Sequence, residues 1–393
     1  MTIDLPYGRQ TIDDDDIAAV VKVLKSPSLT AGPAVQEFEA SLAGHVRARD
    51  AVSCSNGTAA LHLALLALGV EAGDWVIVPA ITFVATANAV RLCGGDVLFC
   101  DVDPLTGAMT AEGLEAVLAR NPDRRIKGVI PVHMAGHSVD MQRVSGIAKR
   151  HGLFVLEDAC HALGGHQETE PAEWAPVGAN VHGDATVFSF HPVKSITTGE
   201  GGAVTTNDTR LADHMRRLRS HGIERLAGDP QPWRYSLKEL GLNYRMTDIQ
   251  AALGISQLKK LDEFVSARRY LAERYNHLLA PLMPAIRPCP VPSYARSAWH
   301  LYRVLIDYSA VGYSRAAIMR RLGEQGIGTQ VHYIPVSSQP YYERLYGAGD
   351  MPGADTYYSQ VLSLPLHPRM TEADIARVAG ALKFITQGVE MAS

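Results

Sequence analysis

Lys194 lies where an apolar, strand-like run over residues 187–190 gives way to a polar turn rich in glycine, residues 195–202. A lysine amine condenses with a carbonyl once burial or nearby cations lower its pKa, so such a strand end suits a Schiff base. A lone lysine is more often a solvated surface residue, because lysine is almost always exposed. The run around Lys194, together with the two polar motifs described next, favours a Schiff-base lysine over a surface lysine.

Asp158 is the second residue that could do chemistry. It follows an apolar run over residues 153–156, which places it at the carboxyl end of a strand, where open α/β folds bind their ligands. A buried carboxylate there needs a cationic partner, and a protonated pyridine nitrogen is one that also acts as an electron sink. A metal ligand and a helix cap are the alternatives. No His, Asp and Glu set at metal-ligand spacing accompanies Asp158, so we expect no metal site.

A third feature is the segment Ser-Cys-Ser-Asn-Gly-Thr at residues 53–58, which leads directly into a strong helix pattern over residues 59–68. Free backbone N–H groups and the positive end of such a helix face any bound anion, so the segment is a candidate phosphate cup. A simple helix N-cap is the alternative. The chain has no Walker loop, and no GxGxxG follows a strand to indicate a dinucleotide site.

The elements that must position these residues alternate along the chain. Short unbroken apolar runs at residues 75–79, 97–100, 128–132 and 153–156 are separated by helix-length segments, as in a mainly parallel sheet covered on both faces. Beyond about residue 250 come a long helical stretch at 249–275, a proline-rich segment at 281–292 and a smaller alternating region. The sequence therefore predicts an α/β protein with a large domain over residues 1–250 and a smaller α/β domain over 251–393.

Composition excludes several classes of function. The net charge of −4 and pI near 6.4 leave no basic surplus for nucleic acid. No stretch approaches the length of a bilayer span, and the first residues lack a basic region followed by an apolar core, so no membrane partner is expected. The five cysteines are scattered and form no CxxC pair. These features indicate a cytosolic (cytoplasmic) protein with reduced cysteines.

Taken together, the motifs resemble the fold-type-I enzymes that use pyridoxal 5'-phosphate, and within them the DegT/DnrJ/EryC1/StrS family of sugar aminotransferases. The resemblance covers nearly the whole chain. It rests on residues 55–58, 82–88, 157–162, 188–194 with 197–202, and 241–248. It implies an aspartate aminotransferase-like fold, with a large, mostly parallel-sheet domain and a smaller C-terminal α/β domain.

By this resemblance, Lys194 binds the cofactor covalently and Asp158 pairs with its pyridine nitrogen. Phe83 matches the aromatic residue that stacks on the cofactor ring, with an ordinary core residue as the alternative. His161 falls where many relatives carry glutamine near the phenolic oxygen, and its protonation state is open. The phosphate-binding residues are Gly57, Thr58, Ser189 and Asn243, the last from the partner subunit.

The resemblance also implies the reaction and the assembly. L-glutamate is the family's usual amino donor, a nucleotide-linked keto sugar is the acceptor, and Lys194 serves as general base and acid. Ping-pong kinetics follow from two half-reactions at one cofactor. The Arg-, Gly- and Pro-rich texture of residues 223–237 before Asn243 fits a loop excursion, so we expect a homodimer with shared active sites.

A narrower resemblance connects residues 6–13, 232–235 with 240–245, and 330–336 to the branch that makes UDP-4-amino-4,6-dideoxy-N-acetyl-β-L-altrosamine, in pseudaminic acid synthesis. The substrate there is a UDP-linked 4-keto-6-deoxy-2-acetamido sugar, aminated at C4. The implied substrate-binding residues are His332 and Tyr333 near the sugar, and Tyr7, Arg9 and Arg245 near the nucleotide or the edge of the site. A packed structural histidine is the alternative for His332.

Three functions therefore remain open, and the first is the C4 aminotransferase of a nucleotide-linked sugar. The acceptor could be another nucleotide-linked keto sugar, GDP- or dTDP-linked, because related enzymes share the same cofactor residues. A sugar 3-dehydratase of the same fold has histidine at the lysine position, so Lys194 argues against it. A non-catalytic protein that binds pyridoxal phosphate for structure or regulation is countered only by the complete set of expected catalytic residues.

Overall fold

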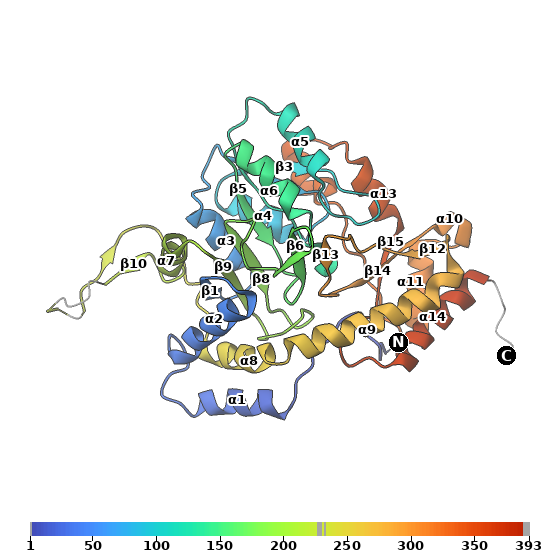
Figure 1. Ribbon diagram of the computed structural model, residues 1–393, viewed down its shortest axis with the longest axis horizontal. Helices are drawn as coiled ribbons and strands as arrows, with labels where there is room; N and C mark the ends of the chain where they lie inside the picture. Colours follow the sequence, from blue (N-terminus) through green and yellow to red (C-terminus); the bar gives the residue numbers. More distant parts are fainter. Residues whose placement is uncertain (1, 226–229, 232, 388–393) are drawn as a thin grey trace.

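The computed structural model describes residues 2–225, 230–231 and 233–387 (Figure 1). Its centre is a seven-stranded sheet in which every neighbouring pair is parallel except the two pairs that involve β9. The predicted, mainly parallel sheet is thus confirmed. In spatial order the strands are β1 (Asp50–Cys54), β9 (Gly202–Thr206), β8 (Ala185–Ser189), β5 (Phe154–Asp158), β4 (Ile126–Val129), β2 (Trp75–Pro79) and β3 (Asp96–Cys100).

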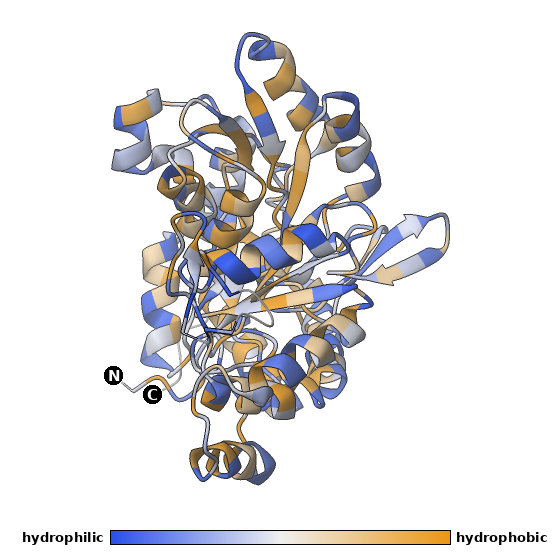
Figure 2. Cartoon of the chain, turned by 90° about the vertical axis from the view of Figure 1, so that its left-hand side faces the viewer, coloured by the Kyte–Doolittle hydropathy of each residue, from blue (hydrophilic) through white to orange (hydrophobic). Residues whose placement is uncertain are grey.

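Both faces of this sheet are buried, which explains why its strands are unbroken apolar runs. Val76 and Val78 of β2 pack into one hydrophobic cluster, whereas Ile77 between them packs into another on the opposite face. The first face is covered by α3 (Gly57–Ala67), α4 (Val84–Leu92) and α7 (Thr209–Leu218). The other is covered by α2 (Pro33–Val46), α5 (Ala111–Arg120), α6 (Met141–Arg150) and α8 (Asp248–Leu258). In Figure 2 the surface helices carry hydrophilic residues beside hydrophobic ones, as amphipathic helices do.

A second hydrophobic cluster forms the C-terminal part of the molecule. Its sheet is antiparallel and has three strands in the order β12 (Ile286–Pro288), β14 (Tyr302–Ile306) and β15 (Val361–Leu364). The main helices around it are α9 (Leu261–Leu279), α11 (Arg315–Glu324) and α14 (Glu372–Gln387). Leu5 belongs to this cluster and its N–H donates to the Gly326 carbonyl at 3.1 Å, so the N-terminal arm packs on the C-terminal part.

The helical stretch expected over residues 249–275 is two helices, α8 and α9, separated at Lys259 and Lys260. The ammonium of Lys260 lies 2.5 Å from Asp13 and 2.9 Å from Asp16, both of them acids at the start of α1 (Asp14–Leu24). These ion pairs hold the chain where α8 ends and α9 begins, and α1 packs along α8 (Figure 1).

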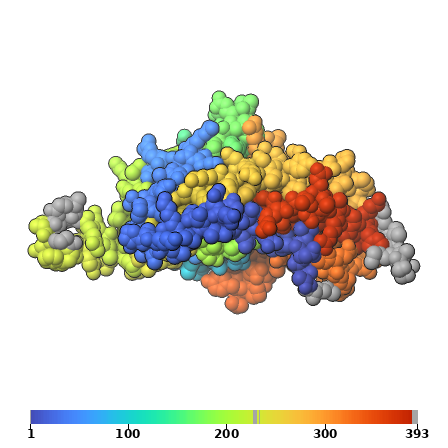
Figure 3. Space-filling view, turned by 90° about the horizontal axis from the view of Figure 1, so that it is seen from below, coloured from blue at the N-terminus to red at the C-terminus, as the bar shows by residue number. Residues whose placement is uncertain are grey.

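The excursion expected at residues 223–237 contains a short hairpin, β10 (Ile223–Glu224) paired with β11 (Ser236–Leu237); residues 226–229 and 232 lie outside the described part of the chain. Figures 1 and 3 both show the described residues of this segment protruding from one end of the molecule. A small sheet of β6 (His166–Glu170), β7 (Glu173–Pro176) and β13 (Ala295–Arg296) was not foreseen. Within the described residues, no helix has both the length and the apolar character needed to cross a bilayer.

Candidate active site

A cavity of about 850 Å³ opens beside Lys194 at the carboxyl ends of β5 and β2. Ten of the thirteen site residues expected from the sequence line it, although they come from segments spread over more than 300 residues. They are Tyr7, Gly57, Thr58, Phe83, Asp158, His161, Ser189, Lys194, His332 and Tyr333. The structure therefore brings every expected cofactor residue except Asn243, and three of the five substrate-binding candidates, into one pocket.

Asp158 is buried at the last position of β5, with 5% of its surface exposed. Its Oδ2 accepts a hydrogen bond from the Thr86 hydroxyl at 2.8 Å, and its Oδ1 accepts one from the Cys160 N–H at 3.2 Å. These donors hold the carboxylate toward the pocket, where it can pair with a protonated ring nitrogen. Across the described residues no group of three or more His, Cys, Asp or Glu is placed to hold a metal ion.

Lys194 follows the end of β8 in a tight turn, in which its N–H donates to the His191 carbonyl at 2.9 Å. The turn is held from behind, because the Thr197 hydroxyl and the Thr198 N–H both donate to the Phe190 carbonyl. Burial lowers the pKa of the Lys194 amine below its ordinary value, while the nearby Asp158 partly opposes this. A lowered pKa favours the neutral amine, which is the form that attacks a carbonyl.

The proposed phosphate cup is the start of α3. Asn56 caps the helix by accepting from the Ala59 N–H at 2.8 Å, which leaves the N–H groups of Gly57 and Thr58 without intrahelical partners. A Cβ on Gly57 would lie 2.9 Å from the Cβ of Ser189, so only glycine keeps this space open beside the serine hydroxyl. Two free N–H groups, one hydroxyl and a helix N-terminus fit a phosphate group.

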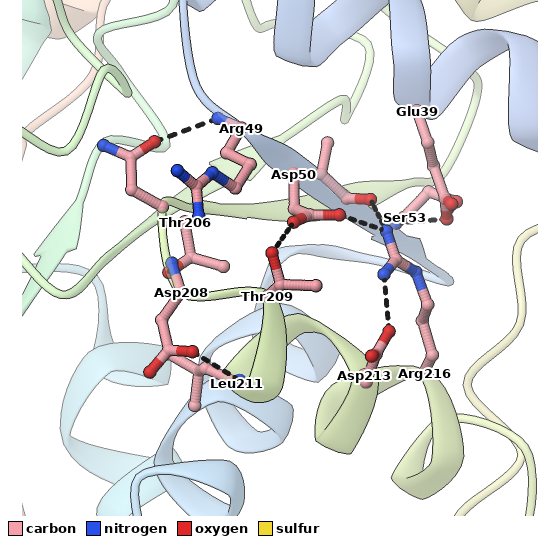
Figure 4. Close-up of polar contacts among 12 residues, drawn as sticks. Glu39, Arg49, Asp50, Ser53, Thr206, Asp208, Thr209, Leu211, Asp213 and Arg216 are labelled. Carbon is pink, nitrogen blue, oxygen red and sulfur yellow. Dashed lines mark hydrogen bonds and ion pairs between the residues drawn. The ribbon is translucent and has the colours of Figure 1, made fainter.

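The strand that leads into the cup is anchored by ion pairs. Figure 4 shows Arg216 of α7 reaching Asp50 of β1 at 2.8 Å and Asp213 of its own helix at 2.9 Å. Glu39 of α2 accepts from both the N–H and the hydroxyl of Ser53 at 2.8 Å. These contacts fix β1, whose last residue, Cys54, is three residues before Gly57 of the cup.

The hydrogen bonds of His161 are consistent with one protonation state of its ring. Its Nδ1 accepts a hydrogen bond from the Ala135 N–H at 3.3 Å, so this nitrogen carries no proton. Burial, together with Lys194, His332 and Arg303, lowers the pKa of His161 well below its usual value. The imidazole is therefore neutral, with its proton on Nε2, which lies 3.2 Å from the Tyr333 hydroxyl. The state that the sequence left open is the Nε2–H form.

The exposure of Phe83 and His332 bears on the alternatives given for them, a core phenylalanine and a packed structural histidine. Phe83 is 55% exposed and lines the pocket, with its ring centroid 6.0 Å from that of Tyr333, so it is not a core residue. His332 is 5% exposed but also lines the pocket, with Nδ1 2.8 Å from the Ser363 hydroxyl and its ring 5.5 Å from Tyr7. It is thus both packed and within reach of a ligand.

Three expected residues do not line the pocket. Arg9 is exposed and borders a small recess behind Lys194. Asn243 is exposed and Arg245 half-buried, and they flank Tyr244, which does line the pocket. Their assigned roles stay predictions.

The structure also adds pocket residues that sequence reasoning missed, among them Thr86, Tyr244, His300 and Gln330. His300 is 3% exposed, and its ring lies 4.4 Å from that of His161. Thr86 was within the motif at residues 82–88, but only the fold reveals its contact with Asp158. In the structure the Thr86 hydroxyl also lies 2.7 Å from the hydroxyl of Thr82, four residues earlier.

A family model described as the DegT/DnrJ/EryC1/StrS aminotransferase family matches residues 10–383. The spore coat polysaccharide biosynthesis protein SpsC of Bacillus subtilis (strain 168) is 39% identical over 393 residues, covering 98% of each chain.

Solved structures of two further proteins extend the comparison. Helicobacter pylori PseC, an aminotransferase involved in the biosynthesis of pseudoaminic acid, is 30% identical with a TM-score of 0.88, covering 98% of this chain and 100% of its own. The putative sugar aminotransferase Spr1654 of Streptococcus pneumoniae is 27% identical; its PMP form has a TM-score of 0.89 and its PLP form 0.87, covering 98% of this chain and 100% of that one.

Proposed function

This chain belongs to the DegT/DnrJ/EryC1/StrS aminotransferase family, and from that premise we propose that it is a C4 aminotransferase acting on a nucleotide-linked sugar. It is a pyridoxal-phosphate enzyme of fold type I, as its relatives are. The proposed reaction moves an amino group from L-glutamate to a UDP-linked 4-keto-6-deoxy-2-acetamido sugar, giving UDP-4-amino-4,6-dideoxy-N-acetyl-β-L-altrosamine. The observation that carries this proposal is the placing of Lys194, Asp158 and the phosphate cup in one pocket.

When bound, pyridoxal phosphate supplies a carbonyl that takes up amines and a ring that accepts electrons. Lys194 would bind that carbonyl and, when free, would move protons as the neutral amine that its burial favours. Asp158 would keep the proton on the ring nitrogen. Gly57, Thr58 and Ser189 would hold the phosphate, and the exposed Phe83 would contact the ring.

The choice of sugar rests on the sequence segments around Tyr7, His332 and Tyr333 and on the similarity to PseC, whose pathway yields pseudoaminic acid. SpsC is a spore coat polysaccharide biosynthesis protein, a name that specifies no nucleotide sugar. A GDP- or dTDP-linked keto sugar is therefore the second candidate. Lys194 stands against a dehydratase that lacks the lysine.

We also propose a homodimer with shared active sites, because the pocket of one chain is short of positive charge. Among its described lining residues Lys194 is the only lysine or arginine, and that side chain is needed for the cofactor. A nucleoside diphosphate needs further cations or amide donors. Asn243 and Arg245 do not line their own pocket, and Trp233, in the protruding segment, and Leu240, just after it, are 71% and 88% exposed, as at an interface.

A cytosolic location completes the proposal. All five cysteines are free, and three of them, Cys54, Cys100 and Cys289, are buried. Unpaired thiols of this kind are typical of a reducing compartment.

Spectroscopy of the purified protein tests the aminotransferase assignment. Protein reconstituted with pyridoxal phosphate should show the long-wavelength absorption band of the lysine-bound cofactor, and L-glutamate should bleach it. Lys194→Ala should lack the band, whereas replacement of the exposed Lys149 by alanine should leave it intact. If glutamate leaves the wild-type spectrum unchanged, glutamate-driven transamination is wrong. Incubation with UDP-, GDP- and dTDP-4-keto sugars, followed by identification of the aminated product, then decides the acceptor.

A further inference from the structure

Two adjacent pocket residues, His332 and Tyr333, each carry a polar group whose hydrogen-bond direction is set by a second residue. We propose that both donate toward the pocket, forming a two-donor wall that recognises an acceptor oxygen of the ligand, and that Ser363 and His161 are the positioning residues that set this direction. The identity of the ligand rests on the proposed function. The donor directions rest on contacts within this chain.

The direction at Tyr333 starts from a backbone amide, which can only donate. The Ala135 N–H donates to Nδ1 of His161, so the proton of this neutral imidazole is on Nε2 and points at the Tyr333 oxygen 3.2 Å away. The phenolic oxygen accepts that bond, and its own O–H must find an acceptor elsewhere. The described residues offer it none, and Tyr333 lines the pocket. The O–H is therefore available to a ligand.

Ala135 is held in an unusual conformation at this point. Its φ of 60° lies in the left-handed region, which disfavours residues with a side chain. Its carbonyl accepts from the Leu301 N–H at 3.3 Å, and the carbonyl of Gly136 accepts from the Ala298 N–H at 3.0 Å. Backbone strain of this kind persists where the surrounding structure enforces it, often beside a functional site. Here the left-handed conformation belongs to Ala135, whose N–H donates to Nδ1 of His161.

The direction at His332 is set by Ser363, which is fully buried on β15. The Ser363 hydroxyl lies 2.8 Å from Nδ1 of His332 and has no other hydrogen-bond partner among the described residues. If Nδ1 donated, the serine proton would be buried without an acceptor, which is costly. The serine therefore donates to Nδ1, and Nε2 carries the proton. Burial and the charges of Lys194 and Arg303 lower the pKa of His332 to about 3, so the ring is neutral.

The rings of His332 and Tyr333 lie 4.8 Å apart, edge to face, in the same pocket wall. Two donors in one pocket wall match an oxygen that only accepts, such as the ketone of a keto sugar or the deprotonated phenolic oxygen of the cofactor. A ligand without such an oxygen leaves both donors unpaired. In a buried site this costs binding free energy, so the wall discriminates against that ligand. The two-donor wall thus selects for a carbonyl-type oxygen.

Nuclear magnetic resonance of the holoenzyme labelled with ¹⁵N in its histidine rings tests the donor directions without any sugar. His161→Gln and His332→Gln identify the two signals by their loss. We expect both residues in the Nε2–H form, and in Ser363→Ala we expect the His332 signal to change while His161 keeps its form. A His332 proton on Nδ1 in the wild-type enzyme would overturn the proposal, whether or not the enzyme aminates a sugar.

Kinetics test the consequence for the ligand. Ser363→Ala should raise KM for the keto sugar roughly three- to tenfold while the glutamate half-reaction keeps its rate, and Ser363→Thr should restore KM. Ser359→Ala, an exposed serine four residues earlier, is the control. Tyr333→Phe separates the two oxygens: weaker cofactor binding without sugar assigns the phenolic oxygen, and a raised KM alone assigns the sugar. A folded Tyr333→Phe enzyme with both properties unchanged would show that the wall recognises neither.

Discussion

The Thr86 hydroxyl donates a 2.8 Å hydrogen bond to Oδ2 of Asp158, and both residues are buried. Thr86 lies in the first turn of α4. Phe83, the N-cap of this helix, was the one residue there that the sequence assigned to the cofactor. The same helix start thus presents an aromatic ring to the pocket and a hydroxyl to the carboxylate. The other donors to the Asp158 carboxylate in the described residues both come from Cys160, its N–H and its thiol, and Thr86 supplies the hydrogen bond to Oδ2.

Replacing Thr86 with valine tests this hydrogen bond with little change of shape. The variant leaves Oδ2 of Asp158 buried without its donor, so we expect the free energy of unfolding of the cofactor-free protein to fall by about 1–3 kcal/mol. We expect kcat to fall about tenfold, since the carboxylate is less firmly held. Urea unfolding and steady-state rates measure both effects. Thr86→Ser keeps the hydroxyl and should retain most of both; a valine variant equal to wild type would contradict the assigned role.

Replacing Gly57 with alanine tests the phosphate cup. The added Cβ would lie 2.9 Å from the Cβ of Ser189 and 3.3 Å from the sulfur of Cys160, in the space assigned to the phosphate. We expect the affinity for pyridoxal phosphate to fall at least tenfold, by absorption titration. Gly146→Ala is the matched control, because its Cβ meets nothing within 4 Å and alanine favours the interior of α6. Equal affinity in the two variants would place the phosphate elsewhere.

The sequence predicted the central sheet well because burial on both faces leaves a strong local signal, as in the run at residues 75–79 that became β2. It extended β4 to residue 132, whereas the strand ends at Val129, two residues before Pro131, which has no N–H for the ladder. The break between α8 and α9 was missed because it depends on ion pairs of Lys260 with distant acids.

In the site, too, residues with a local sequence signal were predicted and contacts between distant segments were not. Residues inside contiguous motifs, such as Lys194 and Asp158, line the pocket, and their chemical roles stay predictions. Contacts between motifs were not foreseeable, because the fold alone brings Ser363 to His332 and Ala135 to His161. His300 had no motif around it, and only its packing against His161 places it in the pocket wall.

Acid should destabilise the cofactor-free protein through His332. The pKa of His332 is about 3 in the fold, mainly because of burial, against an ordinary value near 6.5, so the unfolded chain binds a proton first as the pH falls. Stability is then lost as the pH falls from about 6.5 towards 3, by about 2 kcal/mol between pH 7 and 5 from this residue alone. His332→Gln cannot bind that proton, so its unfolding free energy should vary less with pH.

The control for the acid experiment is His151→Gln, which changes an exposed histidine. Chemical unfolding at pH 7, 6 and 5 gives the three pH profiles. If His332→Gln follows the wild-type slope as closely as His151→Gln does, His332 is not the buried neutral group that the structure describes.

Hybrid dimers test whether active sites are shared. Lys194→Ala removes the cofactor lysine, and Asn243→Ala removes the amide expected to reach the phosphate in the partner's pocket, so each variant alone should be inactive or strongly impaired. In a hybrid of the two, one pocket combines Lys194 of one chain with Asn243 of the other and should regain about half of the wild-type activity per dimer. If Asn243 served its own pocket, the hybrid would gain nothing over the Asn243→Ala homodimer. Differently tagged chains, co-expressed and purified on both tags, supply the hybrid, and light scattering checks that it is a dimer.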